Sequence, residues 1–149
     1  MAGVSNLPVT RRVTREVRDA CLCLHLQRAA RVVARRFDEA FRPLGLTSGQ
    51  FSLLMSLNRA EPPGPAAIAS VLAMDRTTLT ANLKPLERRG LVRIEGDAID
   101  RRRRKLALTE KGRSLLAEAL PIWRRTHRAI ERPLTQSPDR LRADLRRLS

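Results

Sequence analysis

The stretch PAAIASVLAMDRTTLTANLKPLERRG, residues 65–90, decides the fold of this chain. A first short helix is predicted to follow Gly64 and run through Ala73, because glycine then proline suits an N-cap and a first helical turn. A second helix is predicted over Arg76–Arg89, with Asp75 as its N-cap. Two short helices joined by a tight turn have the proportions of a helix-turn-helix.

Apolar residues recur at helical spacing on both helices and predict which faces are buried. They are Ile68, Val71 and Leu72 on the first helix and Leu79, Leu83 and Leu86 on the second. Pro85 removes one backbone hydrogen bond and predicts a kink near Ala81. Because the apolar spacing continues across Pro85, we expect a single helix there.

The opposite face of the second helix carries side chains suited to DNA, and we call it the recognition face. Its residues are Arg76, Thr77, Thr80, Ala81 and Lys84. Such side chains can donate to base edges, touch a thymine methyl group or reach phosphate. No acidic residue interrupts this face, so it can approach a polyanion without repulsion. A solvated helix face without a ligand is the alternative interpretation.

A β-hairpin is predicted to follow, because residues 91–95 and 104–108 alternate as strands around a charged turn. Five consecutive cations at 101–105 come directly after Asp100. They repel one another, which favours a tip that lies along a phosphate backbone or enters a minor groove. Asp100 could orient one guanidinium through a bidentate pair. The candidate DNA-binding residues of this tip are Asp100, Arg101, Arg102 and Arg103; a solvated basic run is the alternative.

Long helices are predicted on both sides of this region. Residues 9–42 contain neither glycine nor proline, and their apolar spacing predicts one helix that stops at Pro43. Apolar residues off its main stripe, near the N-terminal end, indicate contact with a partner chain. After the hairpin, Thr109 is predicted to cap a helix that is broken or bent at Pro121 and ends before Pro133. A last short helix begins after Ser137, with Leu141, Leu145 and Leu148 facing inward.

Another helix is predicted between the first long helix and residue 65. Thr47 and Gln50 form a capping box, and Leu46 is placed to pack against Phe51 as a hydrophobic staple. The predicted buried face consists of Phe51, Leu54, Met55 and Leu57. The chain is therefore expected to be mainly α-helical with a small β-hairpin.

Composition limits the classes of function that fit. Thirty Lys and Arg against fifteen Asp and Glu give a formal net charge of +15 over 149 residues. This excess repels itself in a compact state, so we expect a polyanionic partner, with nucleic acid before an anionic membrane surface. Arginine-rich surfaces in GC-rich genomes are an alternative explanation. No signal-peptide core or run of eighteen apolar residues is present, which favours a cytoplasmic protein.

Candidate catalytic and metal sites are weak. The chain has no glycine-rich phosphate loop, nucleophile motif or facing pair of carboxylates, so we expect no enzyme and no cofactor. Cys21 and Cys23 are too few for a disulfide framework and fit a reducing cytosol. Cys21 and His25, one helical turn apart, supply fewer ligands than a metal requires, so no metal site is predicted.

Three segments together resemble the MarR family of winged helix-turn-helix transcription regulators. They are LTSGQFSLLMSL (46–57), IASVLAMDRTTLTANLKPLERRGLV (68–92) and DRRRRKLALTEKG (100–112). The resemblance implies a homodimer joined by the first and last helices, with its recognition helices in successive major grooves of a palindromic operator in double-stranded DNA. It implies that Arg102 enters the minor groove and that Asp100 positions it. The expected domains are an N-terminal dimerisation helix (1–45), a DNA-binding lobe (46–108) and C-terminal dimerisation helices (109–149), in one compact unit.

The resemblance also bears on regulation. It implies a sequence-specific regulator, expected to be a repressor that a small aromatic or apolar effector releases. Phe37, Phe51 and Trp123 are the candidate lining of an effector cleft, and a core or interface role for Trp123 is the alternative. Cys23 matches the position of the reactive cysteine in the family's organic-hydroperoxide sensors. Those sensors surround the cysteine with tyrosines and this chain has none, which favours a buried inert thiol over redox sensing. A non-specific nucleoid or RNA-binding protein is the alternative from another class.

Overall fold

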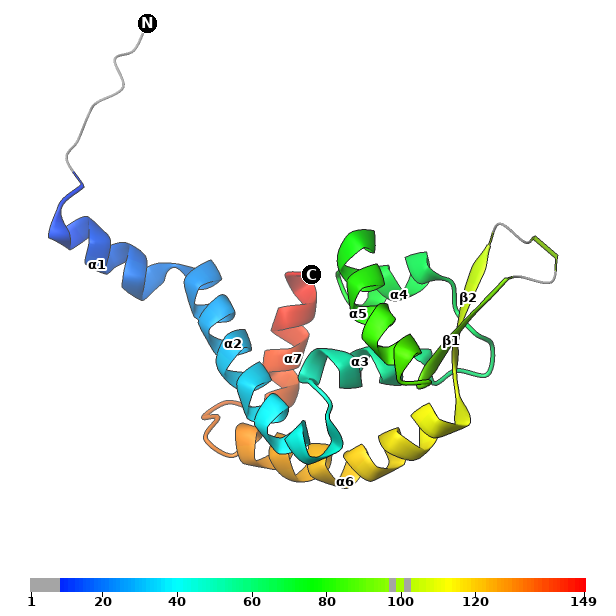
Figure 1. The fold of residues 1–149 in the computed structure, drawn as a ribbon. Coiled ribbons are helices and arrows are strands. Elements are labelled where there is room, and N and C mark those ends of the chain that lie inside the picture. The colour runs from blue at the N-terminus through cyan, green and yellow to red at the C-terminus, as the bar shows by residue number, and fades with distance from the viewer. Residues whose placement is uncertain (1–8, 97–98, 101–102) are drawn as a thin grey trace, which may run out of the picture. The chain divides into compact units, whose positions relative to one another are not determined.

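The computed structural model describes residues 9–96, 99–100 and 103–149, which are mainly helical with one β-hairpin, as predicted (Figure 1). Backbone contacts divide the chain into two units, residues up to Val33 and residues from Ala34 onward. The elements in chain order are α1 (Arg11–Ala20), α2 (Leu22–Phe41), the short 3-10 helix η1 (Arg42–Leu44), α3 (Ser48–Leu57), α4 (Pro65–Val71), α5 (Arg76–Arg88), β1 (Val92–Gly96), β2 (Arg104–Leu108), α6 (Glu110–Glu131) and α7 (Pro138–Arg147).

The predicted single helix over residues 9–42 is wrong, because two helices meet at Cys21. Cys21 has an extended backbone, with φ −70° and ψ 105°, and it ends α1 before α2 begins. The ring Nε2 of His25 lies 3.1 Å from the carbonyl oxygen of Asp19, so a side chain contacts a carbonyl at the end of α1. Neither glycine nor proline marks this break, and apolar spacing alone could not reveal it. The predicted end of the helix before Pro43 is confirmed.

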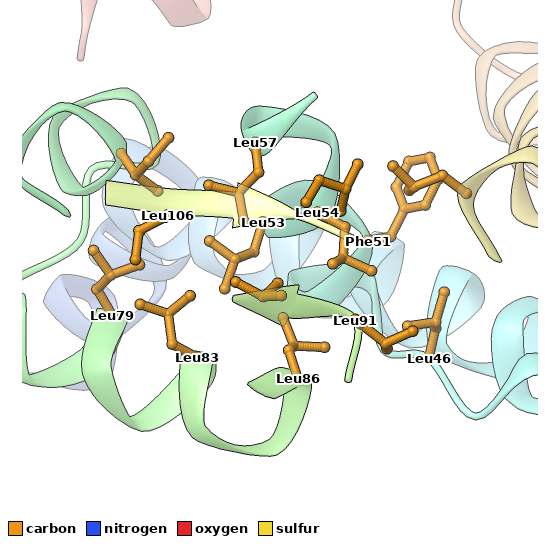
Figure 2. Packing of buried hydrophobic residues seen from close by; sticks show 14 of the residues in the cluster. Leu46, Phe51, Leu53, Leu54, Leu57, Leu79, Leu83, Leu86, Leu91 and Leu106 are labelled. Carbon is orange, nitrogen blue, oxygen red and sulfur yellow. The ribbon is translucent and has the colours of Figure 1, made fainter. Parts of the chain in front are cut away.

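The core of the second unit is mainly aliphatic. Leu79, Leu83 and Leu86 of α5 point toward the hairpin and the leucines of α3 (Figure 2). The fully buried large side chains are Phe41, Leu53, Leu54, Leu57, Ile68, Leu79, Leu86, Leu91 and Leu106. Met55 and Val71 were predicted to face inward, but they are 41% and 60% exposed. Leu53 and Ala69 are buried instead. Helical spacing identifies the centre of a buried helix face, but it does not determine which adjacent residues also belong to that face.

The last helix also differs from its prediction. Leu141, Leu145 and Leu148 are all exposed rather than turned inward. They recur along one stripe of α7 and its C-cap, and no described residue covers them enough to bury them. Their spacing correctly predicts an apolar stripe, but a spacing pattern does not tell whether the same chain or another chain covers it.

Two helices continue through an internal proline. α5 is one helix across Pro85, as predicted, and α6 is one helix across Pro121 rather than two. Among the described residues, no helix is both long and apolar enough to cross a membrane.

The hairpin is antiparallel, and its register pairs Val92 with Leu108 and Gly96 with Arg104. β2 is also tied to the loop before α4, since the amide of Leu106 donates to the carbonyl of Pro63 at 2.9 Å. The hairpin base is therefore held on both edges of β2.

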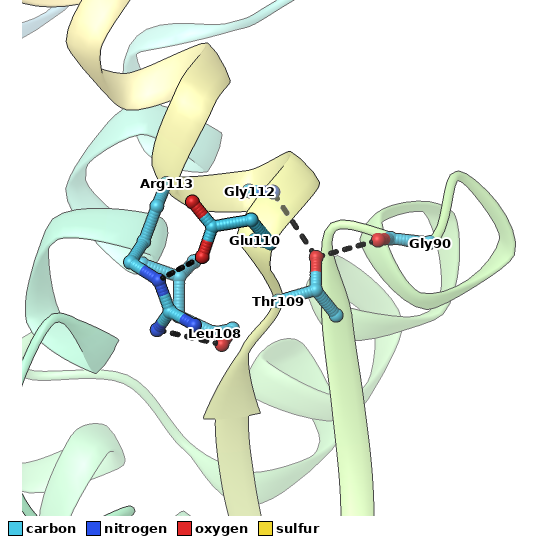
Figure 3. A network of polar contacts seen from close by, with 6 residues as sticks. All are labelled: Gly90, Leu108, Thr109, Glu110, Gly112 and Arg113. Atoms are coloured by element: carbon cyan, nitrogen blue, oxygen red, sulfur yellow. Dashed lines mark hydrogen bonds and ion pairs between the residues drawn. The ribbon is translucent and has the colours of Figure 1, made fainter.

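A polar junction joins the end of α5 to the start of α6 (Figure 3). The hydroxyl of Thr109 donates to the carbonyl of Gly90 at 2.7 Å and accepts from the amide of Gly112 at 3.0 Å. The Arg113 side chain donates to Glu110 at 3.0 Å and to the carbonyl of Leu108 at 3.2 Å. The predicted N-cap role of Thr109 is confirmed.

The close packing at this junction predicts that Gly112→Ala destabilises the fold. A Cβ at residue 112 would overlap the carbonyl oxygen of Leu91 and lie 2.8 Å from Cδ1 of Leu108. We expect a free energy of unfolding lower by about 1–3 kcal/mol, the usual cost of overpacking, measured by urea denaturation. Gly49→Ala is the control, because its Cβ would meet nothing closer than 4.0 Å; equal destabilisation of both variants would contradict the prediction.

Candidate nucleic-acid interface

The start of α5 is fixed by local hydrogen bonds. Asp75 is the N-cap, as predicted, and its carboxylate accepts from the amide of Thr78 at 2.7 Å and from its hydroxyl at 2.8 Å. These hydrogen bonds lower the pKa of Asp75 below its ordinary value. The turn before it is tight, with Ala73 at φ +50° and the Met74 amide donating to the carbonyl of Ala69. This turn therefore fixes the direction in which α5 starts.

The structure brings all five residues of the recognition face together. Leu79, Leu83 and Leu86 bury the other face of α5, so the recognition face is exposed. An open groove of about 330 Å³ is lined by Arg76, Thr77, Thr80, Ala81 and Lys84. Two of its five lining residues are cations and none is acidic. The Thr80 hydroxyl donates to the carbonyl of Arg76 at 2.8 Å, and it can also accept.

A second groove, of about 650 Å³, continues this surface to the turn end of the hairpin. Arg76 and Thr80 line both grooves, which makes the two contiguous. The residues that line the second groove are Pro62, Gly64, Pro65, Ala66, Arg76, Leu79, Thr80, Arg103, Arg104 and Lys105. We call the two grooves together the cationic surface. It contains five Lys and Arg side chains and no carboxylate among its lining residues.

The predicted residues of the hairpin tip are only partly within the described chain. Arg103 lies in the second groove, and its Nε is 3.7 Å from a carboxylate oxygen of Asp100. Arg101 and Arg102 lie outside the described residues. Arg104 and Lys105 were not among the predicted site residues, although they belong to the same basic run. The structure places both beside Arg76 and Thr80 of α5 in the lining of the second groove, a proximity that the sequence alone does not give.

The three predicted cleft residues lie in one row of aromatic rings. Ring centroids are 5.8 Å apart for Phe37 and Phe41, 4.8 Å for Phe41 and Phe51, and 6.5 Å for Phe51 and Trp123. The Trp123 ring stacks in turn on His127 at 4.6 Å. Phe41, which sequence reasoning missed, is fully buried and joins Phe37 to Phe51. The centre of the row belongs to the hydrophobic core, whereas Phe37 and Trp123 are only partly buried.

The expected burial of Cys23 is wrong, whereas its expected inertness stays a prediction. Cys23 is exposed near the start of α2, and its Sγ accepts from the Gln27 side chain at 3.3 Å, while Cys21 is half-buried. The absence of tyrosines, on which the expectation rested, does not determine how exposed residue 23 is. In the part of the chain that the structure describes, no three His, Cys, Asp or Glu side chains gather as a metal site.

Comparisons with known proteins agree on one class of protein. The MarR family model matches residues 46–103. The chain is 42% identical to the transcriptional regulator HosA of Escherichia coli O157:H7 over 79 residues, which are 52% of this chain and 57% of HosA. The match therefore spans little more than half the length of that relative.

Solved structures extend the similarity over most of the chain. The transcriptional regulator MosR of M. tuberculosis, in complex with DNA, is 38% identical, with a TM-score of 0.78 and coverage of 86% of this chain and 92% of MosR. The transcriptional repressor CouR, bound to a 23-mer DNA duplex, is 34% identical, with a TM-score of 0.72 and coverage of 85% and 89%. CouR from Rhodococcus jostii RHA1 has also been solved with p-coumaroyl-CoA; this structure is 27% identical, with a TM-score of 0.71 and coverage of 87% and 90%.

The lowered pKa of Asp75 predicts a pH-dependent contribution to stability. A carboxylate with a depressed pKa stabilises the fold fully above its unfolded pKa, about 3.9, and loses that contribution as the pH falls through its folded pKa. We expect the difference in unfolding free energy between the wild type and Asp75→Asn to shrink below about pH 4. Asparagine is the matched control because it still caps a helix but does not ionise. A difference that stays constant with pH would contradict this role.

Proposed function

The chain belongs to the MarR family of transcriptional regulators, and from this premise we propose that it binds double-stranded DNA sequence-specifically as a homodimer and thereby regulates transcription. The observation that carries the proposal is the cationic surface, which joins the recognition face of α5 to the turn end of the hairpin without an acidic lining residue. Family members are transcriptional regulators rather than enzymes, in agreement with the sequence prediction.

In this proposal α5 enters the major groove. Arg76 and Lys84 donate to base edges or phosphates, the Thr80 hydroxyl donates or accepts at a base edge, and Ala81 offers its methyl group to thymine. The amide end of α5 adds positive potential toward the backbone. Arg103 and Arg104, at the turn end of the hairpin, contact phosphates beside that groove. Arg102 as the minor-groove arginine, positioned by Asp100, stays a prediction from the family resemblance.

A second copy of the chain is the proposed occupant of the exposed apolar stripes. On α7 and its C-cap the stripe consists of Leu141, Leu145 and Leu148. The first unit separately exposes Val13, Val17, Leu22 and Leu24. Contiguous exposed apolar side chains typically mark an interface. A two-fold dimer would present two recognition faces to half-sites about one helical turn of DNA apart.

We further propose that the protein represses transcription and that a small aromatic or apolar effector releases it. The aromatic row supports this class of effector, because Phe37 and Trp123 are only partly buried at two points along it. The p-coumaroyl-CoA complex of CouR shows that one related regulator accepts a ligand with an aromatic acyl group. Release would follow if the effector changes the spacing of the two recognition faces relative to the half-sites.

Selection of duplexes from a random pool tests the proposed function. We expect the recovered sites to be palindromic, and the wild-type protein to bind a recovered duplex about 10³-fold or more tightly than a random duplex of equal length at the same salt concentration. A ratio below about ten would instead identify a non-specific nucleic-acid-binding protein.

Removing a positive charge from the cationic surface is expected to change how the affinity for DNA depends on salt concentration. Arg103→Ala removes an exposed cation of the second groove and should reduce the slope of log affinity against log salt concentration by about one. Arg125→Ala is the matched control, because Arg125 is exposed on α6 and makes no hydrogen bond or ion pair with the described residues. Equal slopes for the two variants would argue against phosphate contact at the turn end of the hairpin.

A further inference from the structure

Arg89 occupies the C-cap of α5, and its side chain turns toward the corner between α2 and α3. Its Nη1 donates to the carbonyl of Gly45 at 2.6 Å, and its Nη2 donates to the carbonyl of Leu44 at 3.2 Å. The planar guanidinium thus holds two successive carbonyl oxygens of a segment that precedes it by more than 40 residues. A guanidinium suits this contact because its donors form a fixed fork.

The two carbonyls lie where a helix ends and therefore need donors. η1 ends at Leu44, and the chain leaves it through Gly45 in the left-handed conformation, at φ +61°. The last carbonyls of a helix have no amide partner within it, and cationic side chains commonly supply one. Arg89 meets this need from α5. The contact accordingly ties the recognition helix to the corner that follows α2.

The same end of α5 is held on a second side by α6. The backbone carbonyl of Arg89 accepts from Nζ of Lys111 at 2.8 Å, and the next carbonyl, that of Gly90, accepts from the hydroxyl of Thr109. The α2–α3 corner, α5 and α6 therefore converge on one helix terminus. The backbone of residues 89 and 90 faces α6, and the side chain of Arg89 faces the corner.

We propose that Arg89 is a positioning residue for the recognition face, a role that rests on the proposed DNA-binding function. Arg89 lines neither groove of the cationic surface, so its effect on DNA would be indirect. At 1.5 Å per residue the 13-residue helix α5 is about 20 Å long. A tilt of about 5° at its C-terminal end would move its first turn by nearly 2 Å, more than base-edge hydrogen bonds tolerate.

The test measures the affinity of each protein variant for two different duplexes and compares the two values. Wild-type protein, Arg89→Ala, Arg89→Lys and the control Arg125→Ala are titrated with a selected duplex and with a random duplex of equal length, at one salt concentration. We expect Arg89→Ala to reduce the ratio of the two affinities by about tenfold or more, the discrimination that one good base contact supplies. Arg89→Lys should reduce the ratio less, because lysine keeps the charge but not the planar fork. Arg125→Ala should leave the ratio unchanged.

A purely stabilising role gives a different result. A variant with a smaller folded fraction binds both duplexes more weakly by the same factor, so an unchanged ratio for Arg89→Ala would overturn the positioning role. If Arg89→Ala does not fold, Arg89→Lys decides the question by the same ratio. Wild-type protein that does not prefer the selected duplex would refute the proposed function itself, and the positioning role with it.

Discussion

The hydrogen bonds at the C-terminal end of α5 set the geometry on which the rest of the second unit depends. At Gly90 the chain turns out of the helix at φ +69° and enters β1 two residues later. Thr109, at the other end of the hairpin, bonds back to that turn and caps α6. Gly112 lets α6 approach the carbonyl of Leu91 more closely than any larger residue would. These few contacts therefore fix the directions of α5, the hairpin and α6 relative to one another.

Charge repulsion within the cationic surface destabilises the isolated fold, whereas the same charges would stabilise a complex with a polyanion. Like charges at the turn end of the hairpin repel one another, and the exposed ion pair of Arg103 with Asp100 offsets little of that repulsion. The fold tolerates it because stability comes from a separate, aliphatic core that contains no buried charged side chain among the described residues. The two faces of α5 thus differ: leucines pack in the core on one face, and the other face exposes the cations for which we propose DNA binding.

Local chemistry explains which features the sequence predicted well. The caps at Thr47, Asp75 and Thr109 depend on residues three positions away, and all three are confirmed. The exposure of Met55 depends on register within a helix, which apolar spacing leaves ambiguous, and neither glycine nor proline marks the break at Cys21. The contacts of Arg89, and the grouping of Arg104 and Lys105 with α5, depend on segments far apart in sequence. Only the three-dimensional structure brings those segments together.

The aromatic row has a spectroscopic consequence. Trp123 is the single tryptophan of a chain without tyrosine, so near-ultraviolet excitation at long wavelength addresses one indole ring. That ring is stacked between Phe51 of α3 and His127 of α6. Its fluorescence therefore reports on one location in the second unit, and it does so without an attached dye. A ligand that separates these rings, or a shift between α3 and α6, would change the emission of a natural probe that packs against the core.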